Sequence, residues 1–186
     1  MSRSSDKRER LVEAARTLIH RQGFRPTTLA DIASESGVPL GNVYYYFKTK
    51  DELAAAVIEE RGEEFRRQFD AWEQELQDPR QRIHRFIDLI HSYRDILTRH
   101  GCPIGSLCQE LDKGRIALSD KADAVLRDQI AWITGQFRQM GAPGAEELGI
   151  YFVSTLQGMA LVANALGDHT VVEQQTTRLR NWLDTL

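Results

Sequence analysis

The stretch TTLADIASESGVPLGNVYYYFKTK, residues 27–50, decides the fold that we expect for this chain. Its first part has apolar residues at the three-and-four spacing of a short helix, which Gly37 ends. Pro39 permits a second helix, which carries Tyr44, Tyr45 and Tyr46 in succession. Because glycine tolerates the left-handed backbone of a tight turn, this pattern predicts a helix-turn-helix whose second helix enters the major groove of DNA.

Capping residues mark where the neighbouring helices begin. Thr28 with Asp31, and Thr49 with Glu52, have the spacing of capping boxes, and Gly23 ends the amphipathic pattern before them. We therefore expect a three-helix DNA-binding head that runs directly into a long fourth helix. The expected head covers residues 1–50, and the four helices cover residues 6–22, 28–36, 39–46 and 50–77.

Helical periodicity continues to the C-terminus, and no stretch alternates with the period of two that a half-buried strand requires. Pro79 starts a helix, Thr170 with Glu173 is expected to cap the last one, and a polar loop surrounds Gly114. The predicted fold is all-α, with nine helices and a ligand-binding and dimerisation body formed by residues 51–186. Beyond the long helix, the expected body helices cover residues 79–99, 104–111, 119–140, 145–166 and 170–186.

Charge is distributed unevenly along the chain. Residues 1–50 hold nine Lys and Arg against five Asp and Glu, whereas the other 136 residues hold fifteen against twenty-two. A basic end on an acidic body favours local contact with phosphate, although a solvated helix face explains a balance of this size equally well. No apolar segment typical of a signal peptide follows the polar start, and two cysteines are too few for a disulfide framework. We therefore expect a cytoplasmic protein.

One segment is apolar enough to raise the question of a membrane. Residues 148–166 are nineteen residues without a formal charge, close to the ~20 that span a bilayer. Polar side chains and two glycines interrupt the run. We interpret it as a helix buried on nearly all sides and expect no membrane partner.

The predicted second helix of the motif carries three adjacent tyrosines. Val43 and Phe47, four residues apart, are expected to anchor it to the core, which leaves the tyrosines for other faces. Three consecutive residues span about 200° of a helix, so at least one tyrosine must be exposed even if the others are core aromatics of a helix bundle. Tyrosine hydroxyls donate to phosphate oxygens, and their rings contact thymine methyl groups. We therefore favour DNA contact.

The segment TTLADIASESGVPLGNVYYYFKTKDEL closely resembles the head of TetR/AcrR-type repressors, and RERLVEAARTLIHRQGF resembles the first helix of that family. The resemblance covers about residues 7–55, and it implies double-stranded DNA as the partner. Tyr46 departs from the histidine often found at its position, which puts its phosphate contact in doubt. The DNA contacts that the resemblance implies are Thr28, Gly41, Asn42, Tyr44, Tyr45, Lys48 and Lys50, with Tyr46 as a further candidate.

The last two helices are the candidate dimer surface. Helix 145–166 is apolar around more of its circumference than one partner helix covers, and its small residues permit close approach of a second helix. The alternative is that these faces contact only their own chain. The family resemblance implies a homodimer built on a two-fold four-helix bundle. The candidate interface residues are Gly149, Ser154, Gly158, Ala165, Trp182 and Leu183.

The middle helices are expected to enclose a pocket for a small-molecule effector. His84 and His91 lie seven apart on one helix face, where they either point into a cavity or are solvated. Further metal ligands cannot be placed, so we expect neither a metal site nor a cofactor. Aromatic residues at helical spacing are also typical of plain core. The candidate lining residues are Phe65, Phe69, Trp72, Phe86, Tyr93, Trp132, Phe137 and Tyr151, with His91.

The segment GCPIGSLCQEL, residues 101–111, is the most unusual stretch of the body. Cys102 precedes a short helix, whose amide dipoles stabilise a thiolate, while Cys108 lies six residues further on. The segment resembles a TetR subgroup of electrophile and acrylate regulators in which Gly-Cys opens the same helix. Cys102 therefore either senses an electrophile or oxidant, lines the small-molecule site with Cys108, or is a plain buried cysteine.

The function that we expect is a ligand-responsive repressor of transcription that acts at a palindromic operator. An activator is an alternative that the sequence does not separate from a repressor, and a helical ligand carrier with a vestigial head is another. An enzyme is not expected, because the sequence has no paired acids, no nucleophile with an evident base and no phosphate loop.

Overall fold

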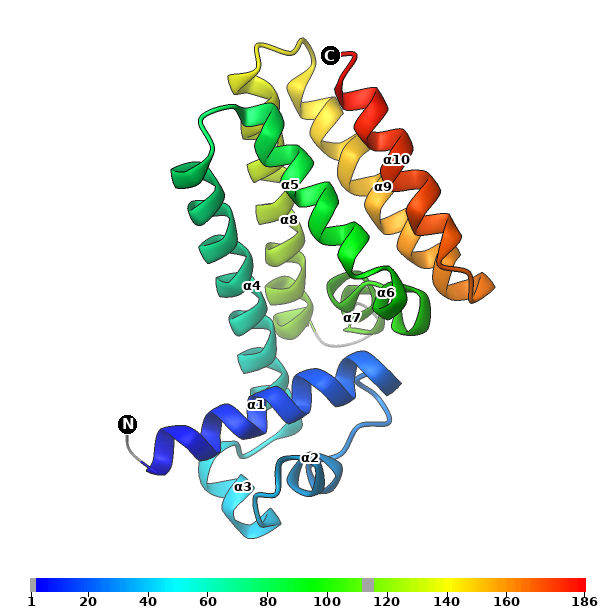
Figure 1. The fold of residues 1–186 in the computed structure, drawn as a ribbon. Helices are drawn as coiled ribbons and strands as arrows, with labels where there is room; N and C mark the ends of the chain where they lie inside the picture. The colour runs from blue at the N-terminus through cyan, green and yellow to red at the C-terminus, as the bar shows by residue number, and fades with distance from the viewer. Residues whose placement is uncertain (1–2, 112–115) are drawn as a thin grey trace. The chain divides into compact units, whose positions relative to one another are not determined.

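The computed structural model describes residues 3–111 and 116–186, and these residues form ten helices and no strand (Figure 1). The all-α prediction is confirmed. The expected loop around Gly114 lies outside the described residues. The helices are α1 (Arg3–Gln22), α2 (Leu29–Ser36), α3 (Leu40–Tyr46), α4 (Lys50–Glu75), α5 (Pro79–Ser92), α6 (Arg94–His100), α7 (Pro103–Leu111), α8 (Ile116–Gln139), α9 (Ala145–Leu166) and α10 (Thr170–Leu183).

The described residues form ten helices where the sequence predicts nine, because the helix expected over residues 79–99 is interrupted at Tyr93. The Tyr93 backbone, at φ −92° and ψ 9°, ends α5, and its N–H bonds with the carbonyl groups of Leu89 and Ile90. Its own carbonyl accepts the N–H of Leu97 and so starts α6. If α5 and α6 are counted as one interrupted helix, the described residues contain the nine expected helices.

The chain forms two compact units. The head unit comprises residues up to Glu63 together with Ser106–Val125, and the body unit comprises Glu64–Gly105 together with Leu126–Leu186. The head unit is therefore larger than the expected 1–50 domain, because it adds the start of α4 and the segment around α7. The chain passes from one unit to the other inside α4, α7 and α8.

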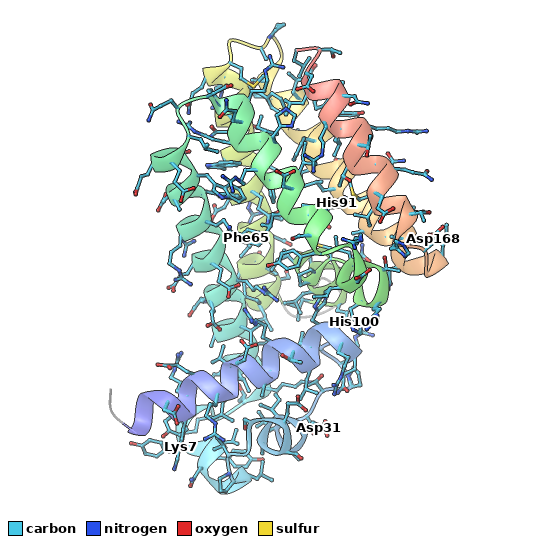
Figure 2. All side chains as sticks on the ribbon, in the orientation of Figure 1. Lys7, Asp31, Phe65, His91, His100 and Asp168 are labelled. Atoms are coloured by element: carbon cyan, nitrogen blue, oxygen red, sulfur yellow. The ribbon has the colours of Figure 1, made fainter. Side chains whose placement is uncertain are left out.

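Side-chain capping is present at the starts of α2, α4 and α5, whereas the capping box that the sequence predicts is absent at the start of α10. At α2 the Thr28–Asp31 capping box is present, and at α5 the Asp78 side chain accepts the N–H of Arg80. At α4 the Thr49 hydroxyl accepts the N–H of Glu52 at 3.1 Å. The box expected at Thr170 and Glu173 is wrong, because the preceding turn supplies the acceptor instead. The carboxylate of Asp168 accepts the N–H of Thr170 at 2.9 Å, and this bond lowers the pKa of Asp168 (Figure 2).

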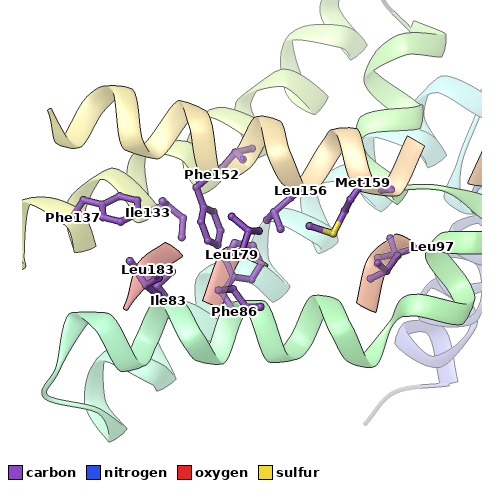
Figure 3. Packing of buried hydrophobic residues seen from close by; sticks show 14 of the residues in the cluster. Ile83, Phe86, Leu97, Ile133, Phe137, Phe152, Leu156, Met159, Leu179 and Leu183 are labelled. Carbon is purple, nitrogen blue, oxygen red and sulfur yellow. The ribbon is translucent and has the colours of Figure 1, made fainter. Parts of the chain in front are cut away.

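The body core is a continuous apolar cluster contributed by α4, α5, α6, α8, α9 and α10 (Figure 3). Helix α10 contacts α5 and α9, and α6 contacts α9. Phe86, Phe137 and Phe152 are among the largest fully buried side chains of this cluster. Burying each aromatic ring removes ~150–250 Å² from water, so these rings dominate the cohesion of the body unit.

The face of α9 that points away from this core does not match the expectation. Phe152, Leu156 and Met159 are buried, but Ile150 and Leu161 are more than half exposed. The expected burial on nearly all sides is therefore wrong within one chain. By length and composition α9 could cross a membrane, a criterion that the core helices of soluble proteins also meet.

Candidate nucleic-acid interface

The turn between α2 and α3 is held by backbone bonds and by α1. Gly37 has a φ of 64°, the left-handed conformation that the sequence predicts. The N–H groups of Gly37 and Val38 bond with the carbonyls of Ser34 and Ala33 at 3.3 and 3.1 Å and so close the last turn of α2. Arg10 of α1 donates to the carbonyl of Ser36 at 2.5 Å. The angle between α2 and α3 is therefore braced from outside the motif.

Helix α3 exposes two of its three tyrosines to solvent, because Val43 and Phe47 fix which side of the helix faces the core. Val43 and Phe47 are buried, so the prediction that they anchor α3 is confirmed. Tyr44 and Tyr45 are 47% and 75% exposed, and Tyr46 is half-buried with its ring edge against Tyr45. The Tyr45 and Tyr46 ring centroids are 5.0 Å apart. Two hydroxyl donors thus lie on an open helix face.

Two further candidate contacts lie on the same short helix. Asn42 is exposed, and a Cβ added at Gly41 would meet no atom within 4 Å. Open space at Gly41 is what close approach of a duplex backbone to α3 requires. Leu40 is 40% exposed at the start of α3 and was not among the predicted contacts. Leu40 lies three residues before buried Val43, and this spacing is the sequence signal that places Leu40 at the edge of the exposed face of α3.

The two predicted lysine contacts also serve the fold. Lys48 Nζ donates to the carbonyl of Tyr44 at 2.6 Å, at the C-terminal end of α3 where carbonyl groups lack helical partners. Lys50 Nζ donates to the carbonyls of Phe24 and Arg25 at 2.9 and 3.0 Å. Lys50 therefore positions the turn between α1 and α2, a role that the sequence pattern does not reveal.

Thr28 and Asp31 form a reciprocal pair at the start of α2, where Figure 2 labels Asp31. The Thr28 hydroxyl donates to Asp31 Oδ2 at 2.7 Å and accepts the Asp31 N–H at 3.1 Å, while the Thr28 N–H donates to the same carboxylate at 2.9 Å. The hydroxyl bond first, and then the backbone bond, lowers the pKa of Asp31. Because its proton is committed to Asp31, the Thr28 hydroxyl must turn before it can donate to a phosphate.

The aromatic residues predicted to line a pocket contact one another in the body unit. The Phe69 and Trp132 rings stack with centroids 4.1 Å apart, and Phe86 lies edge-on to Phe69 at 5.5 Å. Trp72 lies 5.7 Å from Phe69, and Phe65 lies 5.9 Å from it. These rings form one cluster, so their role as pocket lining stays a prediction.

The two histidines of α5 have partners on or next to α10. His91 Nδ1 lies 3.1 Å from the hydroxyl of buried Thr176, and His84 Nε2 lies 2.8 Å from Asp184 Oδ1. Both rings therefore join α5 to the C-terminal end of the chain. In the part of the chain that the structure describes, no three His, Cys, Asp or Glu side chains are grouped as a metal site requires.

Cys102 and Cys108 are not joined to each other by a disulfide, and both are half-buried. Cys102 directly precedes α7, and the N–H of Gly105 in the first turn of that helix donates to Cys102 Sγ at 3.4 Å. An amide donor at a helix start stabilises negative charge on sulfur. Cys108 lies within α7 and belongs to the head unit, whereas Cys102 belongs to the body unit.

The residues predicted for a dimer interface divide into two groups. Gly149 and Leu183 are buried, and Gly149 lies so close to Thr134 of α8 that an added Cβ would collide with it. Trp182 is half-buried between the rings of Tyr151 and Phe137. The outer residues of α9 lie at three-and-four spacing and are all exposed; they are Ile150, Tyr151, Ser154, Gly158, Leu161, Val162 and Ala165. We name this set the outer stripe.

Comparisons with known proteins agree with this geometry. A model of the bacterial regulatory proteins of the tetR family matches residues 11–57. An uncharacterised HTH-type transcriptional regulator of Mycobacterium tuberculosis is 31% identical over 95% of this chain and 93% of its own. The HTH-type transcriptional regulator LmrA of Bacillus subtilis is 28% identical over 73% of each chain. The crystal structure of a TetR transcriptional regulator from Chloroflexus aurantiacus has a TM-score of 0.86 and 25% identity, and covers 99% of this chain and 97% of its own.

Proposed function

The chain belongs to the TetR family of bacterial transcriptional regulators, and we propose that it is a repressor that an effector releases from a palindromic operator. The observation that carries the proposal is the open face of α3, with exposed Tyr44 and Tyr45 above anchored Val43. Hydroxyl donors on a short helix beside open space at Gly41 suit the phosphates and base edges of a major groove.

The recognition helix supplies little electrostatic attraction of its own. No Lys or Arg occurs between Gly37 and Phe47, and Lys48 and Lys50 are the nearest cations after it. Because phosphate neutralisation by Lys and Arg dominates affinity, one such head binds DNA weakly. Two heads, spaced about one helical turn of DNA (~34–36 Å) or a multiple apart, supply the affinity that one lacks.

A homodimer through the outer stripe of α9 provides the second head. Five large apolar side chains of α9 are exposed within one chain: Ile150, Tyr151, Leu161, Val162 and Leu166. Several large apolar side chains exposed on one helix are characteristic of a protein interface. Gly158 has no side chain and Ala165 has a small one, so a second copy of α9 can approach the outer stripe closely at these positions. Gly149 and Leu183 support the interface from beneath, because they fix α9 and α10 to the body core.

The effector is proposed to act on the body and to change which head positions are favoured. A ligand shifts such an equilibrium only by binding the two body conformations with different affinities. Cys102 is the proposed site of a reactive electrophile, since its sulfur accepts the Gly105 N–H at the start of α7. For a non-covalent small molecule, the aromatic cluster around Phe69 is the proposed site, and it must open to admit the ligand. We place the protein in the cytoplasm, where operator DNA lies.

A gel-shift assay with the DNA upstream of its own gene tests operator binding. We expect a shift with that duplex, no shift with a shuffled duplex of equal length, and affinity that falls steeply as salt rises. Tyr45→Ala should weaken binding about tenfold, because it removes a phosphate donor and a ring contact. Tyr93→Ala, which removes a tyrosine of the body that is 47% exposed, should leave binding unchanged.

Three outcomes contradict parts of the proposal. Binding that is insensitive to salt contradicts phosphate contact, and equal loss in the two tyrosine variants contradicts the role of α3. Transcription from the same promoter, measured with and without the protein, separates repression from activation. A promoter that becomes more active when the protein is added contradicts the repressor assignment.

A further inference from the structure

The turn between α1 and α2 receives a side chain from far along the sequence. The N–H of Phe24 donates to Glu110 Oε2 at 2.5 Å, and the two residues are 86 positions apart. Glu110 lies on α7, whose segment from Ser106 onward belongs to the head unit. A charged acceptor makes this bond stronger than an ordinary backbone bond.

The shape of the turn is matched to the Glu110 carboxylate. Gly23 has a φ of 90°, and a Cβ added to it would collide with Glu110 Oε1. The absence of a side chain at Gly23 therefore leaves the space that the second carboxylate oxygen occupies. One oxygen of Glu110 thus accepts the Phe24 N–H, and the other occupies the space beside Gly23.

A cation holds the opposite side of the same turn. Lys50, the first residue of α4, donates to the carbonyls of Phe24 and Arg25, and its Nζ lies 4.3 Å from the centroid of the Phe24 ring. The Phe24 ring itself is buried in the head core. The turn is thus fixed by an anion on its N–H side and a cation on its carbonyl side.

The position of this turn determines where α2 begins. Thr27 is fully buried, and its hydroxyl donates back to the carbonyl of Gly23 at 2.7 Å. Thr28 follows as the cap of α2. A displacement of Gly23 and Phe24 therefore moves Thr27 and Thr28, and with them the start of α2. Helix α2 in turn contacts α3.

We propose that Glu110 is a positioning residue for DNA binding: its carboxylate holds the α1–α2 turn so that α2 and α3 stand in the geometry that binds the operator. This assignment makes α7 a working part of the DNA-binding unit. The helix that carries this acceptor begins directly after Cys102. The inference rests on operator binding by α3 and deepens that function.

Three variants of the full chain test the proposal. Glu110→Ala removes the acceptor, Glu110→Gln keeps an amide oxygen that can accept the Phe24 N–H, and Gln109→Ala changes the exposed neighbour on α7 as the matched control. The measurements are the hydrogen-exchange rate of the Phe24 amide, operator affinity by fluorescence anisotropy, and the midpoint of thermal unfolding.

We expect Glu110→Ala to speed exchange at Phe24 about tenfold or more and to weaken operator affinity about tenfold, at temperatures well below its unfolding midpoint. Glu110→Gln should lie between Glu110→Ala and the wild type, and Gln109→Ala should match the wild type. Partial rescue by glutamine separates the hydrogen bond from a general loss of stability.

Unchanged exchange at Phe24 in Glu110→Ala would overturn the proposal, because the turn would then not depend on the carboxylate. Faster exchange with unchanged operator affinity would overturn it as well, since the turn would then not position the head for DNA. If the wild-type chain binds no operator, the proposed function fails. The positioning role in DNA binding fails with it, whereas the exchange result still decides whether Glu110 holds the turn.

Discussion

The ring of Phe69 and the indole of Trp132 stack at a centroid distance of 4.1 Å, with their planes 7° from parallel. Phe69 lies on α4 and Trp132 on α8, so the stack joins two helices of the body unit. The indole Nε1 also donates to Glu73 Oε1 at 2.8 Å, and Gln136 donates to the same carboxylate oxygen at 3.1 Å. A parallel stack with a hydrogen bond at its edge defines one relative position of α4 and α8.

Phe69→Ala should destabilise the body unit by about 3–5 kcal/mol, because it empties a buried aromatic site and removes four ring contacts. All three tryptophans of the chain lie in the body unit, so fluorescence during denaturant unfolding reports on this unit. Tyr45→Ala, at a ring that is 75% exposed on α3, is the control and should leave this transition in place. Equal unfolding midpoints for Phe69→Ala and the wild type would show that the stack contributes nothing to stability.

The pattern of the sequence predicted what local backbone chemistry determines. Glycines with positive φ end α1 at Gly23 and α2 at Gly37, and the sequence identifies both from their positions after apolar residues at helical spacing. The capping box at Thr28 is confirmed for the same reason, since all its atoms lie within four residues. Such features depend on near neighbours, and near neighbours are visible in the sequence.

Contacts between distant residues were not predictable in this way. The partner of Phe24 is 86 residues away, and the close neighbour of Gly149 is Thr134 on another helix. The sequence pattern therefore assigns Gly149 to a dimer surface, whereas in the structure Gly149 permits close contact between α8 and α9. The sequence predicts the outer stripe only in part. Helical spacing identifies which residues share a face of α9, but not whether that face points toward the core or toward solvent. Burial then separated Ile150 and Leu161 from the inner face.

The Thr28–Asp31 pair makes α2 sensitive to acid. The Thr28 hydroxyl lowers the native pKa of Asp31, so the pair stabilises the folded state above the ordinary aspartate pKa of about 3.9. This contribution disappears as the pH falls through the lowered native value, when Asp31 takes up a proton and ceases to accept the Thr28 bonds.

Thr28→Ala should raise the pKa of Asp31 toward its ordinary value, because it removes the larger cause and keeps the backbone bond. Carbon NMR of the side-chain carboxyls during a pH titration measures this change. Asp168 serves as an internal control, since its pKa is lowered by Thr170 and should be the same in both proteins. A pKa of Asp31 that does not move in Thr28→Ala would assign its depression to another group.

Cys102 should react with an electrophile before Cys108 does, because its sulfur lies at the start of α7, where the Gly105 N–H is directed at it. We expect brief treatment with N-ethylmaleimide to add one adduct at Cys102, detected by peptide mass spectrometry, and to release the operator. Cys102→Ser should abolish the release, and Cys108→Ser, the matched control, should retain it. An unmodified Cys102, together with release that is unaffected by Cys102→Ser, would rule out the sensing role.

Ile150→Glu should convert the proposed dimer into a monomer. The side chain is 57% exposed in one chain and lies on the outer stripe, so in a two-fold interface the two glutamates would be buried close to each other without counter-ions. Sedimentation velocity over a range of concentrations gives the oligomeric state. Ile96→Glu is the matched control, because Ile96 is 46% exposed on α6, outside the outer stripe, and its replacement should leave the dimer intact.

The same variant connects assembly to DNA binding. Because α3 carries no Lys or Arg, a single head makes too few phosphate contacts for tight binding, so Ile150→Glu should also lose operator affinity about a hundredfold or more. Its head should remain folded, because Ile150 belongs to the body unit. A monomeric Ile150→Glu that binds the operator as tightly as the wild type would contradict the need for two heads. A dimeric Ile150→Glu would place the interface elsewhere on the body.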